Sequence, residues 1–199
     1  MRPRSAIMRL IGKEETGPVP WLRLGLVVAV IVGGVFLGRV ALHNDVVRGL
    51  VVRYGYAGVF VVALISGFNL LVPVPAFAFV PLFIAAGLDF AAVLGFIVAG
   101  VTVADMAGFF LGRAGRGFDA VLHAKAVRRL EKFRARHRAA PLVVLALYAS
   151  FAPLPNQVVM VPLGLMGYAA YEVFLPLLVG NFVFNTIAAS GLQFLISRF

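Results

Sequence analysis

The sequence contains no cysteine and only three histidines among its 199 residues. Without cysteine, the chain can form no disulfide and offers no thiolate to a metal ion or a substrate. The histidines, His43, His123 and His137, are scattered through polar connections, and none has a carboxylate at a spacing typical of a metal site. We therefore expect no enzyme activity and no cofactor.

Charged side chains are scarce. They make up 13% of the chain, whereas hydrophobic residues make up 62% and the mean hydropathy is +1.00. A soluble domain of this length does not need so much apolar surface. The composition predicts an all-α integral membrane protein.

The charges that are present are unevenly distributed and give a net charge of +10. Basic residues gather before the first apolar run and again between residues 113 and 138. Lys and Arg favour cytoplasmic loops, so this pattern predicts a multi-pass protein with a cytoplasmic N-terminus. A dedicated site for anionic lipid or nucleic acid is the alternative explanation, but we expect no nucleic-acid partner.

The apolar runs divide the chain into segments. The first is long enough to span a bilayer and has no convincing cleavage site, which favours a retained anchor. Both basic blocks are expected in the cytoplasm. For the chain to reach the second block there, each of the two proline-broken apolar runs must begin and end on the same side of the membrane. The predicted segments are a cytoplasmic N-terminus (1–21), an N-terminal transmembrane helix (22–42), an interfacial amphipathic segment (43–56), a first hairpin-plus-span unit (57–112), a basic cytoplasmic connection (113–140) and a second hairpin-plus-span unit (141–199).

A Pro-x-Pro cluster occurs twice, at Pro73 and Pro75 and again 80 positions later at Pro153 and Pro155. Proline removes a backbone donor and breaks a helix, and lipid cannot satisfy the freed carbonyls. Other residues recur at the same offset, among them Gly87 and Gly167, Gly100 and Gly180, and Asp105 and Asn185. The sequence therefore predicts an inverted repeat of a re-entrant helical hairpin plus a transmembrane helix, with a substrate site at the repeat interface.

Polar side chains close to these breaks would be costly facing lipid and are expected to point into the protein or a wet cavity. They either hydrogen-bond the free backbone at the hairpin tips or form a weakly polar binding site. Asp105 is the one acidic residue in a predicted span, and it either pairs with Arg113 or Asn185 or carries a proton or cation. The candidate pathway residues are Asn69, Pro73, Pro75, Asp105, Arg113, Ser150, Pro153, Pro155, Asn156, Gln157 and Asn185.

Two stretches carry a resemblance to a known family. The first runs from Leu71 to Gly117 and contains the proline break, Ala86-Gly87 and the run Asp105-x-x-x-Phe109-x-x-Gly112-Arg113. The second is Ser150-Phe-Ala-Pro-Leu-Pro-Asn156, with Gly164 eight residues later. Over roughly residues 50 to 195 the chain resembles the DedA family, also called the VTT or SNARE-associated Golgi protein family. The resemblance implies transbilayer movement of lipids, such as recycling of a polyprenyl-phosphate carrier, with proton coupling in some members, and a location in the bacterial inner (plasma) membrane.

The chain departs from that family at its charged positions. No Asp or Glu occurs from residue 46 to residue 88, where carrier-type members have acidic residues around the first proline break. The two family arginines correspond to Ser150 and Asn156, and neither can replace the permanent, bidentate charge with which arginine binds phosphate. Arg113 is the nearest substitute cation.

The leading hypothesis is a DedA-like transporter, either a lipid flippase or scramblase or a small-solute transporter, with the proline-broken tips as its pathway. The alternative is a non-transporting structural or assembly subunit that retains the fold, and the missing charges favour it. The expected partners are membrane lipids, with a homo-oligomer or a membrane protein complex left open.

Overall fold

A computed structural model describes residues 43–68, 75–115 and 134–198, together with single residues at 25, 28, 29, 32, 33, 36, 39 and 132. The predicted N-terminal transmembrane helix and most of the basic connection therefore lie outside the continuous described ranges.

The described residues are helical and contain no strand. The elements are α3 (Asp45–Gly67), the 3-10 helix η1 (Ala76–Phe79), α4 (Val80–Ala85), α5 (Phe90–Gly115), α8 (Ala140–Phe151), α9 (Gln157–Leu165) and α10 (Ala170–Ile196). Three stretches are long and apolar enough to cross a membrane: Gly49–Gly67, Phe90–Gly115 and Ala170–Ile196. The prediction of a helical membrane protein is confirmed at this level.

Helix α3 joins the predicted amphipathic segment to the first predicted hairpin arm. It is kinked at Gly55, where φ is 49° and ψ is −139°, a conformation that glycine adopts without a steric penalty. The straight part after the kink is about 18 Å long at 1.5 Å per residue. Length and composition qualify Gly49–Gly67 as a span, whereas this straight part alone is shorter than the ~30 Å hydrocarbon core.

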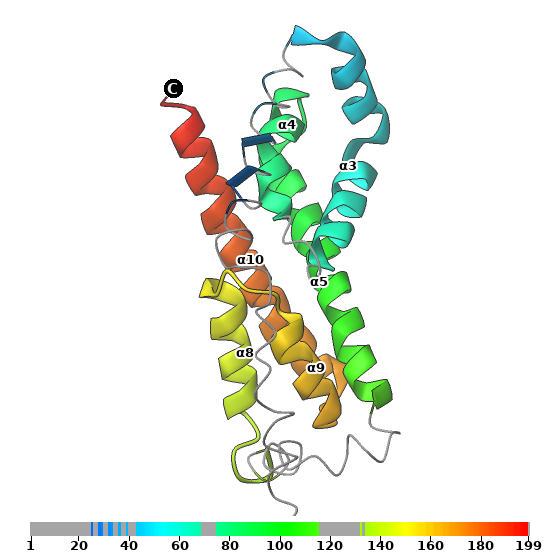
Figure 1. Cartoon of the computed structure of the whole chain (residues 1–199), viewed down its shortest axis with the longest axis vertical. Coiled ribbons are helices and arrows are strands. Elements are labelled where there is room, and N and C mark those ends of the chain that lie inside the picture. Colours follow the sequence, from blue (N-terminus) through cyan, green and yellow to red (C-terminus); the bar gives the residue numbers. More distant parts are fainter. Residues whose placement is uncertain are drawn as a thin grey trace, which may run out of the picture.

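The two long helices, α5 and α10, run antiparallel along the whole bundle (Figure 1). Helices α3 and α4 lie beside one end of this pair, and the short helices α8 and α9 lie beside the other end (Figure 1). Helix α8 has 12 residues and α9 has nine, so neither is long enough to cross a bilayer alone. The chain turns back after α8 and after α4 to enter the next element.

The two short helices α4 and α9 end in the same way, 80 positions apart. Gly87 and Gly167 have φ values of 98° and 74°, the left-handed conformation that closes a helix. The preceding amides make equivalent bonds: Ala86 N donates to Leu82 O (3.1 Å), and Met166 N donates to Pro162 O (2.9 Å). Each ending turns the chain directly into a long helix.

The long helices contact their neighbours through matching glycines. A Cβ added to Gly100 of α5 would lie 2.7 Å from Ala63 Cβ of α3. A Cβ added to Gly180 of α10 would lie 2.5 Å from Ala149 Cβ of α8. Missing side chains therefore let α3 approach α5, and α8 approach α10, at equivalent points of the long helices.

Two apolar cores form around these contacts, one at each end of the bundle. The first contains Val59, Ala63, Ala76, Val80, Phe83, Val93, Ile97 and Ala189. The second contains Phe109, Leu145, Ala149, Met160, Leu163, Met166, Tyr168, Val173 and Leu177. Most residues of one core have a counterpart in the other core. Counterparts in the short and long helices are 80 positions apart, and counterparts in α3 and α8 are 86 positions apart.

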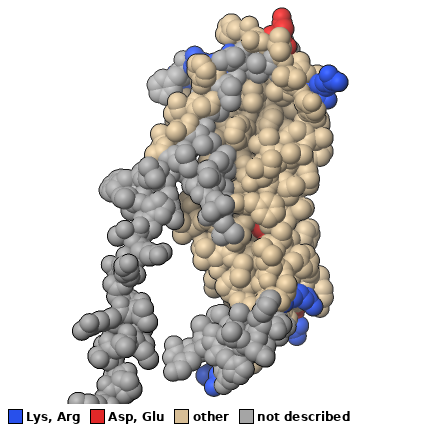
Figure 2. Space-filling view, turned by 45° about the vertical axis from the view of Figure 1, so that its right-hand side comes forward, with Lys and Arg blue, Asp and Glu red and all other residues tan. Residues whose placement is uncertain are grey.

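The outer surface is apolar in its middle. On the face in Figure 2 the coloured Lys, Arg, Asp and Glu side chains gather mainly at the two ends of the molecule. Large side chains such as Phe110, Leu147, Phe151 and Phe182 are more than half exposed. Such a band is unfavourable in water and favourable in a bilayer, in agreement with a membrane protein.

Candidate functional site

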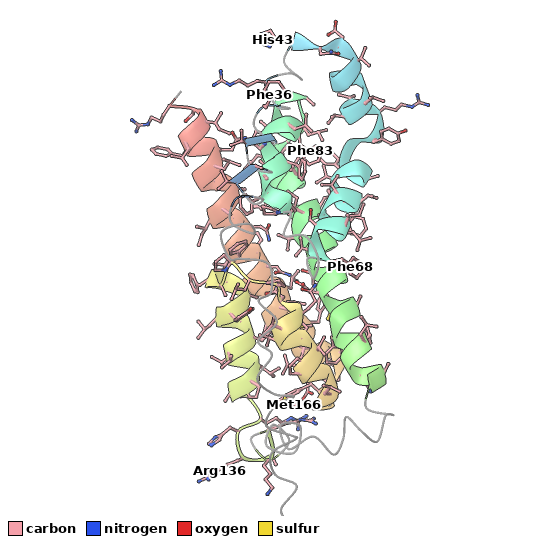
Figure 3. All side chains as sticks on the ribbon, viewed as in Figure 1. Phe36, His43, Phe68, Phe83, Arg136 and Met166 are labelled. Atoms are coloured by element: carbon pink, nitrogen blue, oxygen red, sulfur yellow. The ribbon has the colours of Figure 1, made fainter. Side chains whose placement is uncertain are left out.

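A cavity of about 180 Å³ lies where the broken segments meet the middle of the long helices. Its walls come from the end of α3, from η1, from the middle of α5, from the α8–α9 connection and from α10. Phe68, just after α3, lies at mid-height in Figure 3, between the ends marked by His43 and Arg136. The cavity is thus at membrane depth if the long helices span the bilayer.

Asp105 is the centre of a buried hydrogen-bond network beside this cavity. Its side chain is 2% exposed. Asn156 Nδ2 donates to Asp105 Oδ2 (2.8 Å), and Asn181 Nδ2 donates to the same oxygen (2.9 Å). Asn156 belongs to the tip before α9 and Asn181 to α10, so the carboxylate links three parts of the bundle. Hydrogen bonds to a charged acceptor are about twice as strong as neutral ones.

The same asparagines bond to further groups. Asn156 Nδ2 also donates to Asn181 Oδ1 (2.9 Å), and Asn181 Nδ2 also donates to Thr102 Oγ1 (3.1 Å). Asn185, one turn further along α10, donates from Nδ2 to the Asn181 carbonyl oxygen (2.8 Å). Because the amides of Asn156 and Asn181 are each held by several partners, these two side chains beside Asp105 have little rotational freedom.

The side chain of Gln157, the first residue of α9, reaches both the end of α3 and Asp105 of α5. Its Nε2 donates to the Gly67 carbonyl oxygen at the end of α3 and to Asp105 Oδ1 (2.5 and 3.3 Å). Gln157 is 3% exposed, and its other polar side-chain atom, Oε1, is buried with no hydrogen-bond partner. Gly108 permits this crossing, since a Cβ there would lie 3.0 Å from Gln157 Cγ.

No Lys, Arg or His lines the cavity among the described residues. Arg113, the expected substitute cation, is exposed near the end of α5 and is not part of the cavity wall. The hydrogen bonds of Asp105 come from Asn156, Gln157 and Asn181, so neither of the pairings predicted for it, with Arg113 or with Asn185, is the one observed. Arg113 follows Asp105 by eight positions, about 12 Å along the helix, which is too far for a direct ion pair.

The other predicted residues fall into three groups. Pro75, Pro153 and Pro155 line the cavity together with Asn156, Gln157 and Asn185. Ser150 is buried but bonds its own helix, donating from Oγ to the Ala146 carbonyl oxygen (2.7 Å). Asn69 and Pro73 lie outside the described residues.

The candidate pathway residues did not include several groups that the structure places in the site, although Asn181 is one of the polar side chains near the breaks that we expect to face the protein or a cavity. Asn181 and Thr102 complete the network, and Phe77 and Phe184 form an edge-to-face pair on the cavity wall (6.2 Å between centroids). Helical spacing would have found Thr102, because it precedes Asp105 by three residues. The two phenylalanines carry no such signal, since the chain has 18.

The chemistry of the site is that of neutral amides around one carboxylate. Among the described residues, no group of three or more His, Cys, Asp or Glu could hold a metal ion. The cavity offers hydrogen-bond donors, hydrogen-bond acceptors and aromatic edges to a polar group that enters it. Comparison with known proteins identifies no relative: no family model, no curated protein and no solved structure matches the chain.

Proposed function

We propose that this protein is a DedA-like membrane transporter, a lipid flippase or scramblase or a small-solute transporter, whose pathway is the cavity beside Asp105. The observation that carries the proposal is a cavity between broken helices, mostly apolar but with one carboxylate and several side-chain amides in its wall, inside a bundle whose outer surface is apolar. Ionisable side chains buried at membrane depth are expensive and often belong to substrate or ion pathways.

An inverted repeat is part of this proposal. The matching helix ends at Gly87 and Gly167 and the matching contacts at Gly100 and Gly180 support two units of equivalent design. The shortness of α8 and α9, together with the chain reversal between them, supports a re-entrant hairpin. Two such units entering from opposite sides would place their tips at the same depth, where the cavity lies.

The chemistry of the wall favours certain substrates. A phosphate monoester needs cationic partners, and the cavity wall has none among the described residues. A zwitterionic headgroup or a neutral polar solute can instead use the amides of Asn156 and Asn185. Membrane lipids are therefore the partners that we propose, in a bacterial inner membrane with the N-terminus in the cytoplasm.

Reconstitution into liposomes tests the transport proposal. The purified protein should accelerate the loss of fluorescence when an external reductant quenches a headgroup-labelled zwitterionic lipid. Asn185→Leu removes a polar group from the cavity wall and should reduce the rate about tenfold, as expected for the loss of roughly one hydrogen bond to the passing group. Thr186→Val is the matched control, because Thr186 is the next residue of α10, is not part of the wall and bonds its own helix. A rate equal to that of empty liposomes would contradict lipid transport.

The proposed orientation has its own test. Ala139 and Asp89 are exposed before the starts of α8 and α5, at opposite ends of the bundle. Cysteines introduced singly at these positions of the cysteine-free chain should react with a membrane-impermeant maleimide from the cytoplasmic side at 139 and from the outer side at 89. Labelling of both from one side would refute the topology.

A non-transporting subunit is the second candidate function. The observation that favours it is that Asp105, Asn156 and Asn181 bond one another, as a purely structural network would. Mild detergent extraction discriminates the two functions. A stoichiometric partner that co-purifies, together with no lipid movement in liposomes, would support the subunit, whereas a single species or homo-oligomer that moves lipid would support the transporter.

A further inference from the structure

We propose that the cavity contains a binding site for a monovalent metal cation, held by the Asp105 carboxylate and the free Gln157 Oε1. Cation binding to this site can be measured without any transport. Failure of the transport proposal would therefore not refute the site, and failure of the site would not refute transport.

The first observation is an unbalanced charge. Asp105 is buried, and all its hydrogen-bond partners are neutral amides. Removing a carboxylate from water without a counter-charge costs several kcal/mol even after its hydrogen bonds are counted. Since no Lys, Arg or His of the described residues lines the cavity, a mobile cation is the natural counter-charge.

The second observation is independent of the charge. Gln157 Oε1 is a buried acceptor with no hydrogen-bond partner, on a side chain that lines the cavity and whose amide nitrogen already bonds Asp105. A buried acceptor left without a partner costs about 1 to 3 kcal/mol, so a ligand with positive charge or a donor is missing there. A cation close to Asp105 can satisfy this oxygen as well.

The available ligands indicate which class of cation fits. They are one carboxylate and neutral oxygens, and Asn185 adds a further carboxamide to the same wall. Hard oxygen donors suit alkali and alkaline-earth ions. A single negative charge balances a monovalent ion, whereas a divalent ion bound by one carboxylate would leave a positive charge unbalanced in the buried site. A volume of about 180 Å³ leaves room for water molecules that complete the coordination shell.

The experiment uses the full chain in detergent, with the metal cation alone as the probe. Thermal unfolding is followed in NaCl, KCl and choline chloride at one ionic strength, so that general salt effects cancel. At ~100 times its dissociation constant, Na⁺ or K⁺ should raise the unfolding temperature by about 5 °C relative to choline, because a ligand that binds only the folded state stabilises it. Equilibrium dialysis with the radioactive ion should give one bound ion per chain.

Two variants and one control locate the site. Asp105→Asn should abolish the difference between metal and choline, and Gln157→Leu should weaken ion binding about tenfold, as expected for the loss of one ligand. Asp89→Asn is the matched control, since Asp89 is an exposed aspartate far from the cavity wall that caps α5 through an oxygen that asparagine retains. It should keep the full metal dependence.

Three outcomes would overturn the proposal. One is equal unfolding temperatures in all three salts together with no bound ion by dialysis. Another is a metal dependence that persists unchanged in Asp105→Asn. The third is a stability that follows pH and ignores the metal, which would assign the counter-charge to a proton. If Asp105→Asn does not fold, dialysis on the parent protein and on Gln157→Leu still decides the question.

Discussion

The two halves of the bundle share matching glycine contacts but differ in how closely their short helices approach a long helix. In the second half (α8, α9 and the start of α10), α9 lies directly on α5: a Cβ added to Gly112 would overlap Val161 O, and one added to Gly164 would overlap Phe109 O. In the first half (α3, η1, α4 and the start of α5), the positions 80 residues away from these two glycines are Leu192 and Ile84.

This difference contributes to a polar site on one side only, together with the apolar residues Ala76 and Phe77, which stand 80 positions before Asn156 and Gln157. Backbone contact between α5 and α9 places the tip before α9 against the middle of α5, and Asn156 and Gln157 therefore reach Asp105. At the corresponding positions Ile84 and Leu192 carry side chains, which are incompatible with a backbone contact as close as that of Gly112 and Gly164. The counterpart of Asp105, Asn185, bonds only within its own helix in the described residues.

The largest expected effect comes from filling the close contact of the second half. Gly112→Ala should lower the free energy of unfolding by about 3 kcal/mol or more, because its Cβ meets backbone that cannot rotate away. Gly95→Ala in the same helix has no atom within 4 Å of the added carbon, so it should leave stability unchanged or slightly higher. Unfolding of the detergent-solubilised protein in increasing denaturant measures both. Equal losses at the two positions would refute the close approach of α9.

The next prediction tests the contacts that the halves share. Gly100→Ala and Gly180→Ala should each lower stability by about 2 to 3 kcal/mol, since the added carbons lie 2.7 and 2.5 Å from the facing alanine carbons. The two losses should agree within about 1 kcal/mol, because the packing is equivalent. A large loss at one position and none at the other would break the proposed correspondence between the halves.

A smaller difference is expected between the two polar positions. Asn156→Leu removes a bond to a buried carboxylate and should cost about 2 kcal/mol. Asn185→Leu removes one bond to a neutral carbonyl and should cost about 1 kcal/mol. The same unfolding assay gives the ratio, and a greater loss for Asn185 would indicate that the network has its centre on α10.

The class of the protein follows from the sequence because hydropathy and the distribution of charge report directly on the bilayer as solvent. The polar residues near the cavity could also be proposed, since Asn156 and Gln157 follow a proline break in an apolar run. The predicted boundary between residues 56 and 57 lies next to the kink of α3 at Gly55. The kink itself could not be predicted, because a single glycine in an apolar stretch is compatible with a straight helix and with a break.

The hydrogen-bond partners of Asp105 could not be predicted from the sequence either. Charge complementarity suggested Arg113, two turns further along α5, but side chains two turns apart do not meet on a helix. The observed partners come from elements 51, 52 and 76 residues away, and only the glycine contact between α5 and α9 brings the first two of them within reach. Backbone approach of this kind depends on three-dimensional packing.

The smallest effects are expected at the starts of the two long helices, where the two halves use different residues to accept a hydrogen bond from a backbone amide. At α5, Asp89 Oδ1 accepts a hydrogen bond from Ala92 N (2.9 Å). At α10, Glu172 Oε2 accepts one from Ala169 N (2.8 Å). Positions 89 and 92 at the start of α5 correspond to positions 169 and 172 at the start of α10. The acidic residue is the first of the pair at α5 and the second at α10. Glu172 also accepts from Arg138, and this hydrogen bond raises the pKa of the Arg138 guanidinium.

Glu172→Ala and Asp89→Ala should each cost about 1 kcal/mol, the usual contribution of a helix cap. Glu172→Gln retains the oxygen that accepts from Ala169 N and loses only an ion pair whose Arg138 side chain is 70% exposed, so its cost should stay below about 0.5 kcal/mol and shrink in high salt. Unfolding measurements at low and high salt separate the two contributions. A salt-sensitive loss of more than about 1 kcal/mol in Glu172→Gln would mean that the ion pair stabilises the second half in a way that has no counterpart at Asp89.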